Sequence, residues 1–239
     1  MIVQIADNEL YINDFACHFP IIRWIDNHRF LIADKRNPSK QENLSIFDTT
    51  GRLLTAFYCG DAISTIEVTK EGIWISYFDE GIFGNGISTE GIVLFSFEGT
   101  PLFKYHSDLK EKPFITDCYA TCKGKGNSLW VLPYSDFPLL CLDTANKTIN
   151  HTEIPKVLFG SSALTVRGNF AYFYSPYHDE HKLFSLEIQS KQIHTLGKIH
   201  GVVRGLSPKD NYHFIAKQDN AIKGYTVLND AEYRFVSLT

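Results

Sequence analysis

The residues of this chain that could do chemistry lie in five short polar segments, each of which follows an apolar run. Every segment places an acidic residue within a few positions of the end of that run, and three of the five add a tyrosine. The ten residues of this set are Asp34, Tyr77, Asp79, Glu80, Tyr134, Asp136, Tyr177, Asp179, Glu180 and Asp219. Carboxylates attract a cationic partner and tyrosines supply amphipathic contact area, so the set predicts a binding surface for a basic protein. Aspartate is also favoured at the start of a turn for purely local reasons, and this alternative stays open.

Other motifs that would support catalysis lack the pattern that their chemistry requires. His178 and His181 are three residues apart in what we expect to be an extended loop, which does not direct both imidazoles to one metal ion, and no further ligands have metal-site spacing. The glycine-rich segment 123–127 lacks the ending and the following helix of a phosphate-binding loop. No G-x-S-x-G elbow supports a nucleophilic serine. We therefore expect no catalytic residue, no metal ion and no cofactor.

The composition of the chain indicates which class of partner and which cellular compartment to expect. The 239 residues carry a formal net charge of −4, and the longest basic patch is Lys123 to Lys125, which disfavours a nucleic-acid-binding surface. Five cysteines without paired spacing predict reduced thiols rather than a disulfide framework. The first residues lack the pattern of a signal peptide, and no run approaches the ~18 apolar residues of a membrane span. We expect a cytoplasmic protein that does not bind a membrane.

The elements that position the polar segments repeat along the chain. Each repeat consists of four short runs rich in β-branched and aromatic residues, with a polar turn before the fourth run. These turns lie at 48–51, 97–99, 143–146, 187–190 and 228–230. Their ends are separated by 48, 47, 44 and 40 residues, which is the period of four-stranded propeller blades.

The second run of each repeat is the most apolar, which indicates a strand that is covered on both faces. The five runs of this type lie at 30–33, 73–77, 129–132, 170–174 and 212–216. Trp74 and Trp130 occupy equivalent places in two of them, and we expect both to pack in the core. No segment of a dozen residues has the spacing of apolar residues that is typical of a helix.

The repeat resembles that of the β-propeller class, which includes the WD40 and kelch arrays, in its period, although the WD and GH signatures are absent. The segment 75–85 also resembles part of a blade in bacterial propeller-like proteins that have no assigned function. We predict a single all-β domain, a β-propeller with five blades of four antiparallel strands, and six blades are the alternative. The blades are expected at 20–60, 61–106, 113–154, 161–197 and 200–239. Residues 1–19 either close the ring or belong to a sixth blade.

The favoured function is protein binding without catalysis, through a shared rim formed by the acidic, tyrosine-rich segments. One concrete form is an inhibitor, such as a bacterial immunity protein that masks a basic toxin nuclease. The alternative is a propeller enzyme, or a protein that binds a small ligand or calcium, which would use acids that converge on the central channel.

Overall fold

Strands form nearly all the regular structure of this protein. The computed structural model describes residues 1–5, 8–13, 15–134, 136–177, 181–219, 221–229 and 232–237. The chain divides into two compact units, Met1–Thr116 and Asp117–Thr239. Among the residues described, none of the helices has the length and apolar character needed to span a membrane.

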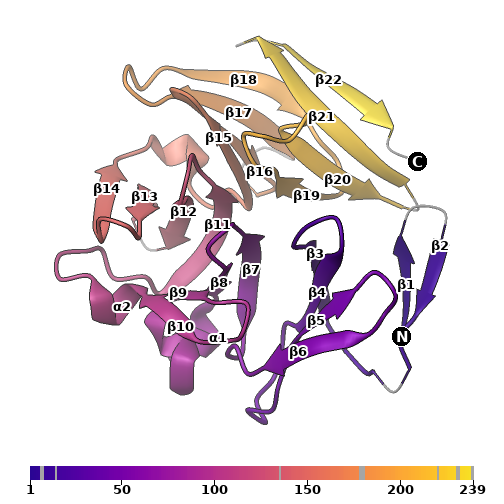
Figure 1. Ribbon diagram of the computed structural model, residues 1–239. Coiled ribbons are helices and arrows are strands. Elements are labelled where there is room, and N and C mark those ends of the chain that lie inside the picture. The colour runs from indigo at the N-terminus through magenta and orange to yellow at the C-terminus, as the bar shows by residue number, and fades with distance from the viewer. Residues whose placement is uncertain are drawn as a thin grey trace. The chain divides into compact units, whose positions relative to one another are not determined.

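The first unit contains one two-stranded sheet and two four-stranded antiparallel sheets, which we call blades 1 and 2 (Figure 1). The two-stranded sheet pairs β1 (Ile2–Ile5) with β2 (Asn8–Tyr11). Blade 1 consists of β3 (Pro20–Trp24), β4 (Arg29–Asp34), β5 (Leu44–Asp48) and β6 (Leu53–Phe57). Blade 2 consists of β7 (Ile63–Val68), β8 (Ile73–Tyr77), β9 (Ile92–Phe95) and β10 (Pro101–Lys104). In both blades each strand pairs with the next one along the chain.

The second unit contains three further blades with the same strand order. Blade 3 consists of β11 (Asp117–Lys123), β12 (Ser128–Tyr134), β13 (Leu139–Asp143) and β14 (Thr148–Thr152). Blade 4 consists of β15 (Ala163–Arg167), β16 (Phe170–Ser175), β17 (Lys182–Glu187) and β18 (Ile193–Lys198). Blade 5 consists of β19 (Val202–Gly205), β20 (Phe214–Gln218), β21 (Ala221–Asn229) and β22 (Glu232–Ser237).

Burial follows the position of a strand within its blade, as the sequence predicted. Every residue of β8 is buried, and so are the central residues of β4 and of β16. The fourth strands β6 and β14 are mostly exposed or half-buried. A strand between two neighbours in a sheet and packed on both faces needs apolar residues at successive positions, which explains the continuous apolar runs.

The turns between third and fourth strands are held by their acidic residues. In blade 1, Oδ1 of Asp48 accepts hydrogen bonds from the backbone N–H of Thr50 at 2.9 Å and of Arg52 at 3.1 Å. Gly51 has a φ of +86°, which an L side chain rarely adopts. In blade 3, Asp143 accepts a bond from the N–H of Ala145 in the same way, at 2.9 Å. Hydrogen bonds from the side chains of Thr50 to Asp48 and of Asn146 to Asp143, and next these backbone bonds, hold the pKa of both carboxyl groups below the usual range.

The cores of the blades are apolar and aromatic. Trp74 is 2% exposed and lies edge-on to Phe103, with 5.7 Å between the ring centroids, so the prediction that it is a core residue is confirmed. Trp130 is half-buried against the core cluster between blades 3 and 4. Val3 of β1 and Ile12, which directly follows β2, lie in one core cluster with Phe30 of blade 1. The hairpin therefore covers one face of the first blade.

The five four-stranded sheets confirm the predicted fold class and the count of five blades. The leading hairpin forms its own two-stranded sheet, and its expected role in closing the ring stays a prediction. The helices of the described residues are few and have three to five residues each, which agrees with the lack of a long helical period in the sequence. The connection from β8 to β9 contains α1 (Asp79–Ile82) and the 3-10 helix η1 (Gly86–Glu90), where we expected an irregular loop. Further short helices are α2 (Tyr105–Asp108) and η2 (Lys156–Leu158).

Candidate functional site

The blades of the second unit are arranged so that their loops between second and third strands lie at one end. Oγ1 of Thr165, in the middle of β15, donates to the carbonyl of Leu206, just after β19, at 2.6 Å. Arg167 donates to the carbonyl of Ser207 at 3.2 Å and lies near Cys122, close to the end of β11. The first strands of blades 3, 4 and 5 therefore end at the same side. Because each second strand runs antiparallel to its first strand, the second strands all end at the opposite side.

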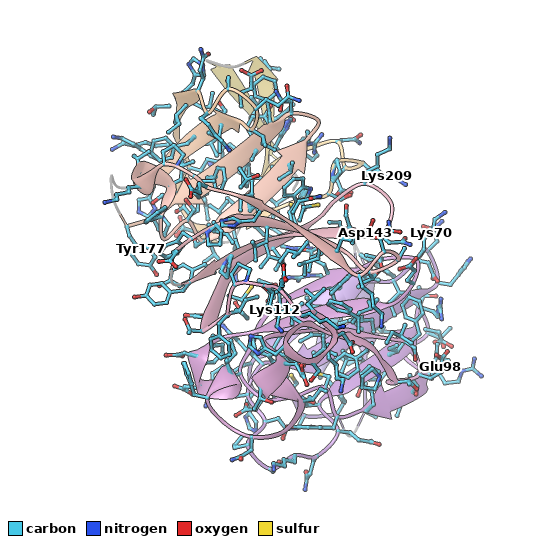
Figure 2. The ribbon with its side chains drawn as sticks, turned by 90° about the vertical axis from the view of Figure 1, so that its left-hand side faces the viewer. Lys70, Glu98, Lys112, Asp143, Tyr177 and Lys209 are labelled. Carbon is cyan, nitrogen blue, oxygen red and sulfur yellow. The ribbon has the colours of Figure 1, made fainter. Side chains whose placement is uncertain are left out.

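Four predicted site residues lie at this end of the second unit, and we call them the unit 2 rim: Tyr134, Asp136, Tyr177 and Asp219. Tyr134 is the last residue of β12 and is 45% exposed, and Tyr177 is 73% exposed and projects outward (Figure 2). Asp136 and Asp219 are exposed, and neither carboxylate has a hydrogen-bonded or ion-paired partner among the residues described. Two further predicted residues, Asp179 and Glu180, lie outside the described residues.

Tyr134 rests on a cluster of aromatic rings. It stacks on Tyr119 at 6.0 Å between centroids and lies edge-on to Phe137 at 5.3 Å. Phe137 stacks in turn on Phe159 at 5.0 Å. Phe137 has a φ of +50°, which is unfavourable for a bulky residue, so its packing must hold it in place. The exposed face of Tyr134 is thus presented on a well-packed base.

The predicted acids of the first unit have structural partners within that unit. The carboxylate of Asp34 accepts the backbone N–H of His18 at 2.9 Å and of Phe19 at 3.1 Å. Glu80 forms an ion pair of 2.6 Å with Arg36, and Asp79 accepts the N–H of Glu80 at the start of α1. The loops after β4 and β8 therefore share one side of the first unit, where Arg36 offsets part of the acidic charge.

Tyr77 does not lie on a surface that a partner could contact. Its side chain is fully buried, and its hydroxyl donates to the backbone carbonyl of Cys59. Burial holds the pKa of this phenol well above its usual value, so it stays a neutral donor. Tyr77 closes the core between β8 and the segment before β7, and we do not include it in a binding surface.

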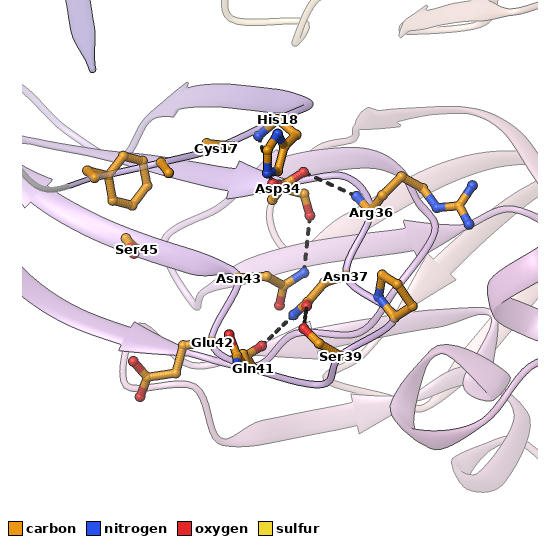
Figure 3. A pocket seen from close by; sticks show the side chains of 13 residues that line it. Cys17, His18, Asp34, Arg36, Asn37, Ser39, Gln41, Glu42, Asn43 and Ser45 are labelled. Carbon is orange, nitrogen blue, oxygen red and sulfur yellow. Dashed lines mark hydrogen bonds between the residues drawn. The ribbon is translucent and has the colours of Figure 1, made fainter.

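A cavity of about 320 Å³ opens in the first unit, between the segment 15–18 and the loop 34–45 (Figure 3). Its wall brings Cys17, His18 and Asp34 together, three residue types that can form a nucleophilic site. Burial, and next the negative charge of Asp34, raises the pKa of Cys17 to about 12. The thiol is therefore protonated at neutral pH and is not an activated nucleophile.

Across the described part of the chain, no three His, Cys, Asp or Glu side chains gather into a group that could hold an ion. Sequence reasoning missed the cavity and the pair formed by Arg36 and Glu80, because both depend on loops that are far apart in the sequence. The adjacent basic residues Lys35 and Arg36 were the one local signal that the first polar segment is not purely acidic.

Comparison with known proteins gives similarity at the level of the fold. No protein-family model matches the chain, and no curated protein matches its sequence. Among solved structures, a catalytically inactive variant of virginiamycin B lyase from Staphylococcus aureus with quinupristin matches with a TM-score of 0.59 and 13% identity, over 100% of this chain and 73% of that one.

Two other solved structures match to a similar extent. A streptogramin B lyase matches with a TM-score of 0.57 and 16% identity, over 88% of this chain and 65% of that one. PorZ, a bacterial surface component of the type-IX secretion system of Porphyromonas gingivalis, matches with a TM-score of 0.57 and 9% identity, over 92% of this chain and 27% of that one. At such low sequence identities the matches show a shared fold but not a shared activity. Together with the five four-stranded sheets, they show that this chain has the fold of a five-bladed β-propeller.

Proposed function

We propose that this protein is a non-catalytic protein-binding propeller, and that it engages a basic partner through the unit 2 rim. The observation that carries the proposal is the difference between two sets of predicted acids. The carboxylate of Asp34 accepts hydrogen bonds from backbone N–H groups of its own unit, so a local structural role explains this residue. Asp136 and Asp219 are exposed and have no partner among the described residues. Their charges remain available to a second molecule.

The chemistry of the rim fits a basic surface on the partner. Exposed carboxylates raise the rate of encounter with a positively charged protein and exclude acidic ones. Tyr134 and Tyr177 add apolar area with a hydroxyl at the edge, which is the type of side chain that dominates binding energy in interfaces. The ring cluster under Tyr134 reduces the entropy that this side chain loses on binding.

In its more specific form, the proposal is an inhibitor that covers the catalytic cleft of a basic toxin nuclease, as a bacterial immunity protein does. A nuclease cleft is lined with cations that contact phosphates, so an acidic rim with tyrosines can occupy the same groups. The five cysteines are thiols rather than disulfides, which fits action in a bacterial cytoplasm.

The test is capture of the partner followed by titration. Tagged protein is used to isolate a partner from an extract of the source organism, and the purified partner is titrated against the double variant Asp136→Lys, Asp219→Lys. We expect at least a tenfold loss of affinity and a weaker dependence on salt. The matched control is Glu71→Lys, Glu98→Lys, which makes the same charge change in exposed turns of blade 2 at the ends of other strands. Figure 2 shows Glu98 at the surface. The control should bind within about twofold of wild type.

Two outcomes would overturn the proposal. Undiminished binding by the Asp136, Asp219 variant would show that the rim is not used. Equal losses in this variant and in the control would show that only net charge matters. Thermal unfolding of each variant checks that the fold is intact.

The cavity in the first unit favours a second candidate, a small-ligand-binding role. Its volume of about 320 Å³ is at the lower end of the range for small-molecule sites, and polar side chains such as Gln41 and Glu42 line it. A panel of polar metabolites and calcium should then raise the melting temperature in proportion to the logarithm of concentration. The absence of any such shift would remove this candidate.

A further inference from the structure

Two histidines of the second unit lie side by side although 19 residues separate them in the sequence. His181 directly precedes β17, and His200 lies in the connection from β18 to β19. Their ring centroids are 5.1 Å apart, with an angle of 55° between the planes. The backbone N–H of Ile199 donates to the carbonyl of His181 at 2.9 Å and so fixes the two segments against each other.

This separation matches that of two imidazoles bound to one metal ion. A zinc–nitrogen bond of about 2.0–2.1 Å places the ion about 3.2 Å from each ring centroid, and a tetrahedral angle then separates the two centroids by about 5.2 Å. The observed separation of 5.1 Å is close to that value. His178, the neighbour that sequence spacing alone would pair with His181, is not needed for this arrangement.

The surroundings of His181 favour a ligand role. The hydroxyl of Tyr174 lies 2.7 Å from Nδ1 of His181 and also donates to the carbonyl of Gly201 at 3.4 Å. A hydroxyl that donates to this carbonyl accepts from Nδ1–H, which leaves the lone pair on Nε2 for an ion. Metal-bound histidines in proteins almost always have such a hydrogen bond on the other ring nitrogen.

Both histidines are also held in defined positions. His181 has a φ of +72°, which is uncommon for a residue other than glycine and indicates a locally constrained backbone. Nε2 of Gln218 donates to the carbonyl of His200 at 2.6 Å and to the hydroxyl of Tyr225 at 3.0 Å. His200 is exposed, so an ion and its water ligands can reach the pair from solvent.

We propose that His181 and His200 bind one divalent transition-metal ion of the zinc or copper type, each through one ring nitrogen. Imidazole is a preferred ligand of Cu²⁺, Zn²⁺ and Ni²⁺, whereas Mg²⁺ and Ca²⁺ prefer oxygen. Water occupies the remaining coordination positions. The site does not depend on the protein-binding role, because it uses none of the four residues of the unit 2 rim.

The experiment is a titration of tag-free protein with Cu²⁺ and with Zn²⁺, followed by calorimetry and, for copper, by electron paramagnetic resonance. We expect one equivalent to bind more tightly than the rest, with nitrogen hyperfine structure from two imidazoles. His200→Ala and His181→Asn should each weaken this equivalent at least tenfold, and asparagine is chosen at 181 because it tolerates a positive φ. The control is His194→Ala, which removes an exposed histidine of β18 in the same blade and should change the affinity less than twofold.

A further variant tests the geometry. Tyr174→Phe keeps the ring and removes the hydrogen bond to Nδ1, so it should weaken binding several-fold without loss of the two-nitrogen signal. The absence of a distinct tight equivalent in the wild-type protein would overturn the proposal. Wild-type affinity in His200→Ala, or equal losses in His200→Ala and His194→Ala, would overturn it as well. Melting temperatures without metal show whether each variant is folded.

Discussion

The stability of the second unit should fall in mild acid because of one buried histidine. His213 is 7% exposed, and its Nδ1 accepts the backbone N–H of Val227 at 3.2 Å, so the ring is neutral in the native state. Its other neighbours are Tyr172, edge-on at 4.9 Å, and the guanidinium of Arg167. Burial, and next the positive charge of Arg167, lowers the pKa of His213 to about 4.

The sign of the effect follows from the two pKa values. In the unfolded chain the pKa is about 6.5, so between about pH 6.5 and pH 4 the unfolded state binds a proton that the folded state does not. The stabilisation is therefore complete above pH 6.5 and is lost as the pH falls through this window. At pH 4.5 the lowered pKa of His213 corresponds to a loss of about 2.5 kcal/mol in the free energy of unfolding. Screening by nearby solvent reduces the expected loss to about 1–2 kcal/mol.

The assay is urea unfolding at several pH values between 7.5 and 4.5, with wild type compared with His213→Gln. Glutamine offers an acceptor to Val227 but does not titrate, so the variant should lose less stability than wild type as the pH falls. The difference in the free energy of unfolding between the two proteins should change by about 1–2 kcal/mol across the range. Parallel curves for wild type and variant would refute the assignment of a neutral, buried imidazole.

Two further predictions concern a buried phenol and a half-buried thiol of the first unit. Tyr77→Phe should lower the free energy of unfolding by about 1–3 kcal/mol, because it leaves the buried carbonyl of Cys59 without this donor. The control Tyr177→Phe, at an exposed position, should change it by less than about 0.5 kcal/mol. Urea unfolding measures both free energies, and equal effects would contradict the burial of Tyr77. Cys17 should react slowly with iodoacetamide at pH 8, and Asp34→Asn should speed the reaction because it removes a charge that raises the pKa of the thiol. Mass spectrometry of the alkylated peptide measures the rate. An unchanged rate in the variant would contradict the effect of Asp34 on the pKa of Cys17.

The fold could be predicted because its signals are local and repeat. The apolar run of β8 and the turn at Asp48 each follow from residues adjacent in sequence, and five copies at a similar period point to blades. The boundaries were less accurate in blade 5, where β20 begins at Phe214 rather than at 212. The α1 turn was missed because four residues are too few to show a helical period.

The candidate site was harder to predict, because the face on which a strand-ending side chain lies changes with a shift of one residue in the end of the strand. Tyr77 and Tyr134 both end a second strand, yet one is fully buried and the other is exposed, since successive residues of a strand point to opposite faces. The partners of Glu80 and His181, which are Arg36 and His200, come from other blades or connections. No local pattern in the sequence announces such pairs.

The central claim, that a basic partner binds at the unit 2 rim, is tested most directly by site-specific crosslinking. A photoreactive phenylalanine analogue is introduced at Tyr134, at Tyr177 or, as a control, at the exposed Leu53 of β6, and cells of the source organism are irradiated. We expect both rim positions to capture the same protein, with a basic surface, and we expect the analogue at Leu53 not to capture it. Capture at Leu53 but at neither rim position, or an acidic protein captured at the rim, would contradict the account.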